Sequence, residues 1–174
     1  EMCIRDRYDG KHGYEILADN TVEELKHIHA VYDLAKEQGD ITDSSYEALE
    51  KRWKDENAER SEKVEKGEVI YGLKEYTFQL YLDYEISTLK EKYCNDTNRE
   101  GMKLTEDEIQ EHYQSREWIF GDSDENADLE MARIAVEREL REQKYDDMIT
   151  QRETGSQVAG NMENVNRITL KNIQ

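Results

Sequence analysis

The sequence predicts a mainly α-helical protein, and three observations support this. Proline is absent from the 174 residues, whereas average usage of about 5 % would give roughly nine, so the commonest interruption of long helices is missing. Charged residues make up 38 % of the chain and the mean hydropathy is -1.07, so apolar residues must gather on narrow faces to offset the entropy lost on folding. Helix-start and helix-stop signals also recur in order. We expect about five helices packed as an irregular helical domain, with a long helix near the C-terminus and one short terminal strand.

The length of the chain is that of about one domain. The opening EMCIRDR, residues 1–7, resembles translated adapter sequence, so we treat it as non-native and expect the true N-terminus to be missing. A helical domain is expected over residues 8–154, followed by a polar tail over residues 155–174.

The first two expected helices share a start signal. In "NTVEELKHIHAVYDLAKEQG", Thr21 and Glu24 stand in capping-box spacing and Gly39 is the stop. In "DSSYEALEKRWKDENAERSEKVEKG", Ser44 and Glu47 repeat this spacing, and a glycine again ends the helix. The charged second half of this helix is expected to project into solvent, supported by pairs of opposite charge one turn apart.

Three further helices and a tail complete the expected order. A short β-favouring run, Val69–Tyr71, precedes a helix from Thr77 to about Cys94. "LTEDEIQEHYQSREW" predicts a shorter helix that opens with another capping box. The longest helix is expected from about Ala127 to Thr154. In the tail, the alternation of Ile168, Leu170 and Ile173 indicates a short strand.

The helix "TFQLYLDYEISTLKEKYC" has two apolar faces. One face carries Phe78, Leu82 and Leu89, which we expect in the core. The other carries tyrosines, including Tyr81 and Tyr84. A helix that is apolar on two sides is usually packed between other helices. The alternative is a partly exposed, tyrosine-lined groove, since tyrosine offers a large contact area while its hydroxyl stays in water.

Charge and hydropathy exclude several classes of function. The chain has 24 Lys and Arg against 42 Asp and Glu, a net charge of -18, which repels nucleic acid and anionic lipid surfaces. No apolar run is long enough for a membrane span, and no leader opens the chain. With Cys3 discounted, Cys94 alone cannot form an internal disulfide.

No catalytic residue, metal site or cofactor is predicted. His27 and His29 point away from each other on a helix, so they cannot share a metal ion. "DSDENAD" begins like a calcium loop, but it has Ala127 where glycine is needed and Arg133 where a glutamate is needed. None of the many carboxylates stands in an apolar setting that would raise its pKa for acid catalysis. The sequence therefore argues against an enzyme.

The order of these segments resembles that of the SurA/PrsA-like foldases and chaperones of bacteria. The resemblance rests on the following segments: "TVEELKHIHAVYDLAKEQG", "YEALEKRWKDENAERSEKVEKGEVIYG", "YTFQLYLDYEISTLK", "LTEDEIQEHYQSREW" and "VERELREQKYDDMITQRE". It implies a SurA N-terminal-like domain that cradles non-native polypeptide outside the cytoplasm, with a lipid anchor on the missing N-terminus. The "IFGDSDENADLEMA" insert is too short for the parvulin-type prolyl isomerase domain of many relatives. The chain departs from the family at Leu73, where proline is expected, and it lacks the expected N-terminal strand.

Three hypotheses about function follow. The first is an exported, ATP-independent chaperone for unfolded or nascent exported polypeptides, with Tyr71, Tyr76, Tyr81 and Tyr84 as client contacts. The alternative is a structural or scaffolding protein whose charged helices bind one fixed partner. The third, a hydrolase, would need a buried carboxylate near a pocket with a raised pKa.

Overall fold

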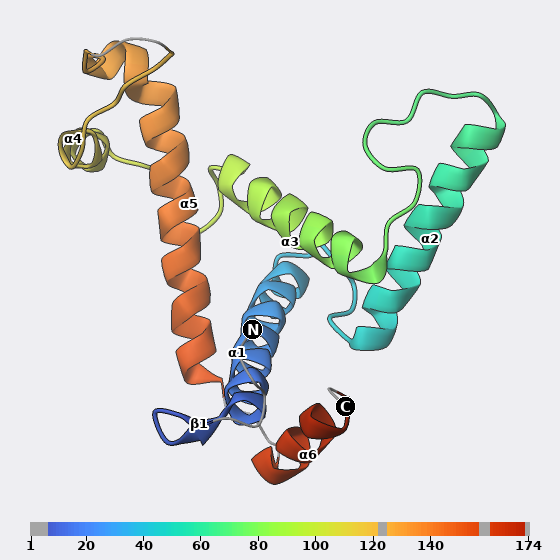
Figure 1. Cartoon of the computed structure of the whole chain (residues 1–174). Coiled ribbons are helices and arrows are strands. Elements are labelled where there is room, and N and C mark those ends of the chain that lie inside the picture. Colours follow the sequence, from blue (N-terminus) through green and yellow to red (C-terminus); the bar gives the residue numbers. More distant parts are fainter. Residues whose placement is uncertain (1–6, 122–124, 157–160, 173–174) are drawn as a thin grey trace. The chain divides into compact units, whose positions relative to one another are not determined.

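The described part of the chain is all α-helical apart from one small hairpin, which confirms the predicted fold class (Figure 1). The computed structural model describes residues 7–121, 125–156 and 161–172. Within these residues the elements are β1 (Arg7–Tyr8), β2 (Lys11–His12), α1 (Gly13–Glu37), α2 (Tyr46–Glu65), α3 (Phe78–Asn95), α4 (Glu106–Gln114), α5 (Leu129–Gly155) and α6 (Met162–Asn172).

The chain divides into two compact units, and α1 and α5 contribute residues to both. The smaller unit holds residues 1–30 and 150–174, and the larger unit holds residues 31–149. The expected boundary at residues 154 and 155 and the non-native reading of residues 1–7 stay predictions. Of those seven residues, only Arg7 lies in the described part.

A two-residue hairpin turn opens the smaller unit. β1 pairs antiparallel with β2, with Arg7 opposite His12. The turn residues Asp9 and Gly10 have φ angles of 50° and 85°. Positive φ at both central positions is the geometry of the turn that an Asp-Gly pair favours between antiparallel strands.

The tail is a helix, so the strand expected around Ile168 and Leu170 is wrong, and Ile173 lies outside the described residues. The side chain of Asn161 accepts a hydrogen bond from the backbone N–H of Glu163 at 2.9 Å and so caps the start of α6. The half-buried face of α6 has helical spacing and consists of Met162, Val165, Asn166, Thr169 and Leu170. Ile168 lies on the exposed face, which explains why local alternation was misleading.

α1 begins earlier than the capping signal predicts. The expected capping residue Thr21 lies inside the helix, where its hydroxyl donates to the carbonyl of Leu17. The predicted end of α1 is confirmed, since Gly39 has a φ of 76° and the backbone N–H of Asp40 donates to the carbonyl of Ala35 at 2.8 Å.

The starts of α2, α3 and α4 in the larger unit follow their caps. Ser45, one residue after the expected Ser44, accepts from the backbone of Ala48. Thr77 caps α3, and Thr105 with Glu108 forms the predicted capping box of α4. Local side-chain chemistry therefore fixes where these helices begin.

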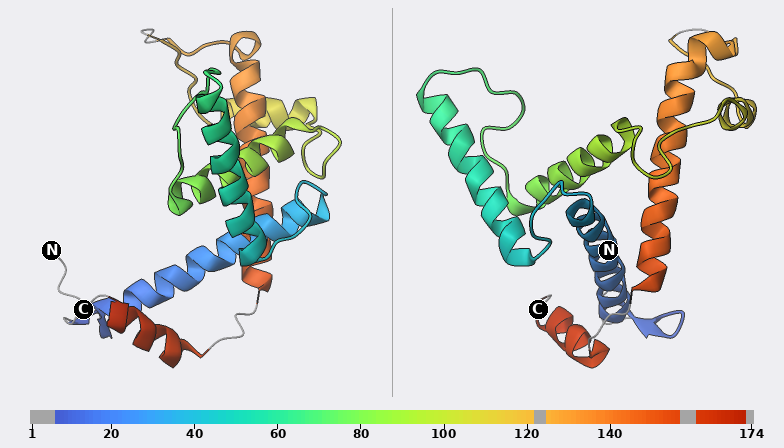
Figure 2. Two further views of the ribbon diagram at one scale, coloured as in Figure 1. Left: turned by 90° about the vertical axis from the view of Figure 1, so that its right-hand side faces the viewer. Right: turned by 180° about the vertical axis from the view of Figure 1, so that it is seen from behind.

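α3 packs on both sides within the larger unit, as its two apolar faces predict, and Figures 1 and 2 show it between α2 and α5. On the α2 side, the ring of Phe78 lies 5.6 Å from that of Trp53. On the α5 side, the rings of Tyr93 and Tyr145 lie 5.3 Å apart. Leu82 and Leu89 are buried, as expected.

A separate apolar cluster joins α4 to the first half of α5. Its buried members are Ile109, Trp118, Ala132 and Val136. The residues of "DSDENAD" that would open a calcium loop, 122–124, lie outside the described part of the chain. No helix of that part is long and apolar enough to cross a membrane.

We expect the charge of Glu108 to stabilise the chain in a pH-dependent way. Hydrogen bonds from Lys144 and from Thr105 lower the pKa of Glu108 from 4.5 to about 2. A carboxylate with a lowered pKa in the folded state stabilises above its unfolded pKa, and this contribution is lost as the pH falls towards the folded value. Glu108→Gln keeps the capping geometry, so it should unfold at lower urea than the parent at pH 7.

The difference should shrink below about pH 4.5 and disappear near pH 2. Glu111→Gln removes an exposed carboxylate of the same helix and serves as the matched control. An equal loss of stability at pH 7 and pH 2 in Glu108→Gln would show that the charge is not the cause.

We expect the Cys94 thiol to be unreactive in the folded chain. Burial raises the pKa of Cys94 from 9.0 to about 11, which leaves about a hundredfold less thiolate at neutral pH. In a Cys3→Ser background, a disulfide reagent should therefore label Cys94 at least about a hundredfold more slowly than it does in urea. Equal rates in buffer and in urea would mean that this part of α3 is open.

Candidate partner-binding surface

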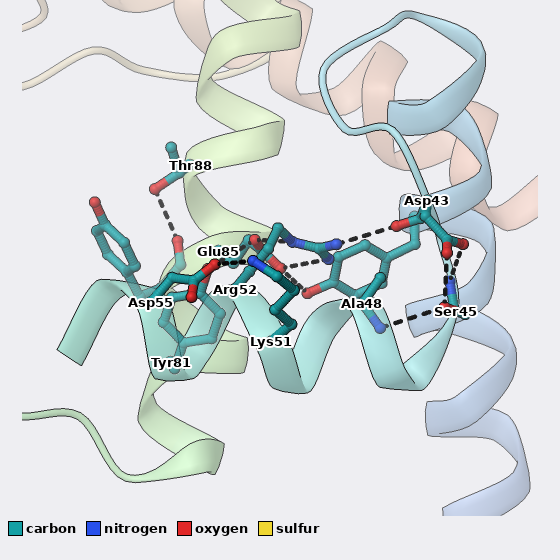
Figure 3. Close-up of polar contacts among 11 residues, drawn as sticks. Asp43, Ser45, Ala48, Lys51, Arg52, Asp55, Tyr81, Glu85 and Thr88 are labelled. Atoms are coloured by element: carbon teal, nitrogen blue, oxygen red, sulfur yellow. Dashed lines mark hydrogen bonds and ion pairs between the residues drawn. The ribbon is translucent and has the colours of Figure 1, made fainter. Parts of the chain in front are cut away.

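The larger unit contains a buried carboxylate whose two oxygens are both occupied (Figure 3). The Glu85 side chain is only 11 % exposed, and Arg52 donates to its two oxygens at 2.7 and 3.0 Å. The hydroxyls of Tyr32 and Tyr81 donate to the same carboxylate at 2.5 and 2.9 Å. A third nitrogen of Arg52 donates to the carbonyl of Asp43. This cluster, which we call the Glu85 centre, links α1, α2 and α3.

The electrostatics of the Glu85 centre favour a structural role over catalysis. Burial, with the adjacent Glu85 charge, raises the pKa of both Tyr32 and Tyr81 well above the usual range. Both tyrosines therefore stay protonated donors at neutral pH. A carboxylate that accepts four hydrogen bonds has no oxygen left to act on a substrate. The Glu85 centre thus gives no support to the hydrolase hypothesis.

Three tyrosines pack together next to this centre, and one of them, Tyr81, belongs to both groups. The ring of Tyr76 stacks on that of Tyr84 at 5.2 Å and meets the edge of Tyr81 at 6.4 Å. The guanidinium of Arg60 lies 4.6 Å from the centroid of the Tyr76 ring. Such stacking fixes the rings in one arrangement. One edge of the cluster reaches solvent, since 41 % of Tyr84 is exposed.

The loop from α2 to α3 presents apolar side chains to solvent. Tyr71 is 87 % exposed, Val69 is 79 % exposed and Leu73 is 48 % exposed. These three residues form what we call the loop surface. Single exposed apolar residues are common on any protein surface. Several large ones in one short loop are more typical of a binding site.

The loop is held against α2 by hydrogen bonds to its backbone. One nitrogen of Arg60 donates to the carbonyls of Tyr71 and Leu73, at 3.0 and 2.8 Å. Trp53 and Asn57 both donate to the carbonyl of Tyr76, and Asn57 accepts from its N–H. The backbone that carries these exposed side chains therefore has few alternative conformations. This lowers the conformational entropy that is lost on binding.

The structure brings together three of the four residues predicted to contact a client. Tyr76, Tyr81 and Tyr84 form one cluster, and Tyr71 stands apart on the exposed loop. Tyr81 is only 5 % exposed and its hydroxyl serves Glu85, so its ring is part of the core. A binding role for the other three stays a prediction.

Sequence reasoning missed the residues that shape this surface. Asn57 and Arg60 lie in the half of the helix that was expected to project into solvent, and Arg52 lies just before it, yet each bonds to α3 or to the loop. A weak signal was available, because these residues, with Trp53 and Glu56, recur every three or four positions along one face of α2. The opposite face does project into solvent, with the exposed pairs Lys51–Asp55 and Glu62–Lys66.

No metal site emerges in the described residues, where no group of three or more His, Cys, Asp or Glu lies close enough to hold an ion. Nδ1 of His27 lies 2.6 Å from a carboxylate oxygen of Glu153, an ion pair or hydrogen bond inside the smaller unit.

Comparison with known proteins identifies two similarities. Among curated proteins, the chain is 30 % identical over 151 residues to a protein of Bifidobacterium longum subsp. longum described as a chaperone for lacto-N-biosidase. The similarity covers 84 % of this chain and 54 % of that protein, so the chain spans about half the length of the curated relative it matches. No family model matches the chain.

Among solved structures, the fold resembles part of the GH136 lacto-N-biosidase from Eubacterium ramulus. The TM-score is 0.63 at 19 % sequence identity, and the match covers 83 % of this chain and 29 % of that one. At this identity the likeness concerns the fold alone.

The resemblance to SurA/PrsA-like foldases is wrong. The sequence is similar instead to a chaperone for lacto-N-biosidase, over 84 % of its length. The resemblance rested on the order of capping boxes and of helices rich in glutamate and lysine. These features stabilise solvent-exposed helices in general, so unrelated helical domains share them.

Proposed function

We propose that this chain is a non-catalytic chaperone dedicated to one enzyme of the lacto-N-biosidase type. The observation that carries the proposal is the 30 % identity, over 151 residues, to a chaperone for lacto-N-biosidase. The description of that relative names one enzyme as the protein it assists. This favours the fixed-partner hypothesis over a general chaperone for exported polypeptides.

The fold comparison supports a lasting association. A fold like this one occupies 29 % of the chain of a GH136 lacto-N-biosidase. A helical domain that is covalently joined to an enzyme cannot leave it after folding. We therefore propose that this chain also stays bound to its enzyme.

The loop surface has the physical properties that a fixed partner requires. General chaperones that accept many sequences use flexible surfaces that can repack. Here Arg60 and Asn57 hold the loop by its backbone, and Tyr84 is stacked on Tyr76. A surface with one fixed arrangement discriminates between partners and loses little entropy on binding.

The proposed mechanism is shielding of an apolar surface of the enzyme while that enzyme folds. Exposed apolar surface on folding intermediates causes aggregation of large proteins. A partner that binds the native enzyme, but not the unfolded chain, also stabilises it by mass action. The net charge of -18 on this chain favours solubility of the complex.

Refolding of the Bifidobacterium longum lacto-N-biosidase with and without this chain tests the proposal. Recovery of active enzyme should rise with added chain and level off at about one chain per enzyme. An unrelated aggregation-prone enzyme, refolded in parallel, should gain nothing. Equal protection of both enzymes would favour a general chaperone, and protection of neither would contradict the proposal.

An extracytoplasmic location stays a prediction.

A further inference from the structure

A groove between α5 and residues 116–120 is lined by exposed apolar side chains. Its volume is about 700 Å³. Ile119 and Phe120 form one wall, at 50 % and 42 % exposure, and Met131 and Ile134 form the other, at 70 % and 84 % exposure. We call this the α5 groove. Exposed apolar clusters of this kind are typical of interaction sites.

The exposure of these side chains follows from the way their backbone is anchored. Trp118 is 3 % exposed, and its ring nitrogen donates to the carbonyl of Tyr113 at 3.0 Å. Its backbone is held on both sides, by Asn126 at 2.5 Å and by the N–H of Ala127 at 2.7 Å. Trp118 is thereby fixed in the core, and Ile119 and Phe120, which follow it, lie outside the core.

The outer face of α5 has the spacing of a helix-packing surface. Ala132 and Val136 point into the core. Met131, Ile134 and the stem of Arg138 then follow one another at intervals of three and four residues on the outer side, and Ala135 lies at the floor of the groove, where it also packs against the core cluster. Rows of this spacing on one helix are the ridges that fit between the side chains of another helix.

Four of the five charged side chains on the rim of the groove are already paired. Arg116 pairs with Glu139, and Arg138 pairs with Glu142 at 2.7 Å. Two arginines face three glutamates on this rim, so the groove is almost neutral although the chain carries a charge of -18. A basic peptide would have to compete with these internal pairs, and a sugar would meet few free polar groups. The chemistry suits an apolar, uncharged occupant.

We propose that the α5 groove is a second docking surface, which receives the apolar face of an amphipathic helix from the partner enzyme. This rests on the proposed function, because it assigns the occupant to the same enzyme. Helix-in-groove docking needs an apolar furrow with outward side chains at helical spacing, and the α5 groove has both. A second copy of this chain is disfavoured as the occupant, because two chains of charge -18 repel each other.

A binding measurement with a matched control tests the groove. The probe is the Bifidobacterium longum lacto-N-biosidase, unfolded and then refolded in a titration with the parent chain or with a variant, so that the enzyme holds no chain at the start. The double variant Met131→Ser, Ile134→Ser should bind about tenfold to a hundredfold more weakly than the parent. Both side chains are largely exposed, so the fold should be unchanged, which circular dichroism checks. The control is Ile168→Ser in α6, which alters another exposed isoleucine and should bind like the parent.

A photo-reactive amino acid at position 134 identifies the occupant directly. Cross-links to a helical segment of the enzyme would support the proposal. Cross-links to a second copy of the chain, or to a non-helical segment of the enzyme, would overturn it.

The two proposals fail in different ways. If the parent chain does not bind the enzyme at all, the proposed function is contradicted and this inference fails with it. If the parent binds and the double variant binds equally well, only the groove assignment is overturned.

Discussion

Replacement of Glu85 by alanine is expected to destabilise the larger unit by about 3–5 kcal/mol. The substitution leaves the guanidinium of Arg52 and the hydroxyls of Tyr32 and Tyr81 without the carboxylate that they share. Loss of one member of a buried ion pair costs about this much, since the remaining charge stays buried and uncompensated. Urea unfolding monitored by far-ultraviolet circular dichroism measures the change.

The neighbouring position provides a matched control for the Glu85 centre. Lys51 precedes Arg52 on α2 and pairs with Asp55, with both side chains more than half exposed (Figure 3). Lys51→Ala should change stability by no more than about 0.5 kcal/mol. Arg52→Ala should cost about as much as Glu85→Ala, and the double variant should cost less than the sum of the two. If Glu85→Ala is no more harmful than Lys51→Ala, the centre does not hold the three helices together.

The double variant Val69→Ser, Tyr71→Ser is expected to weaken binding of the partner enzyme at least about tenfold without loss of stability. These two residues are the most exposed of the loop surface, at 79 % and 87 %. They therefore contribute little to the fold of the isolated chain. Large apolar and aromatic side chains near the centre of an interface contribute most of its binding energy. Titration of the refolded Bifidobacterium longum lacto-N-biosidase gives the affinity.

Leu25→Ser controls for a general loss of apolar surface. Leu25 is 47 % exposed and lies in the smaller unit, away from the loop in sequence. Its substitution should leave affinity within about twofold of the parent. An equal loss of affinity in both variants would mean that binding follows overall hydrophobicity rather than the loop surface.

The sequence was a good guide wherever local chemistry decides the outcome. The caps at Thr77 and Thr105 and the stop at Gly39 stand where they were expected, because each acts on backbone groups a few residues away. The tail was predicted wrongly because its local pattern does not decide its structure. Ile168 and Leu170 alternate locally, but the half-buried face of α6 is set by residues spaced over two turns.

The candidate site depended on contacts that local reasoning does not reach. Tyr81 was expected to face a client, yet it is buried because Glu85 is fixed by Arg52, which lies 33 residues away in sequence. The α5 groove was missed because the exposure of Ile119 and Phe120 depends on the anchoring of Trp118 by Asn126 and Ala127. Such tertiary contacts decide which apolar residues form the core and which remain exposed to bind a partner.

The central claim, a lasting association with one enzyme, is tested most directly by the mass of the folded product. Refolded Bifidobacterium longum lacto-N-biosidase, mixed with excess chain, is passed over a sizing column with light-scattering detection. The account predicts that active enzyme elutes as a complex with one added chain of 20.6 kDa. Fully active enzyme that elutes without the chain would contradict the account, and would mean that the chain acts transiently or not at all.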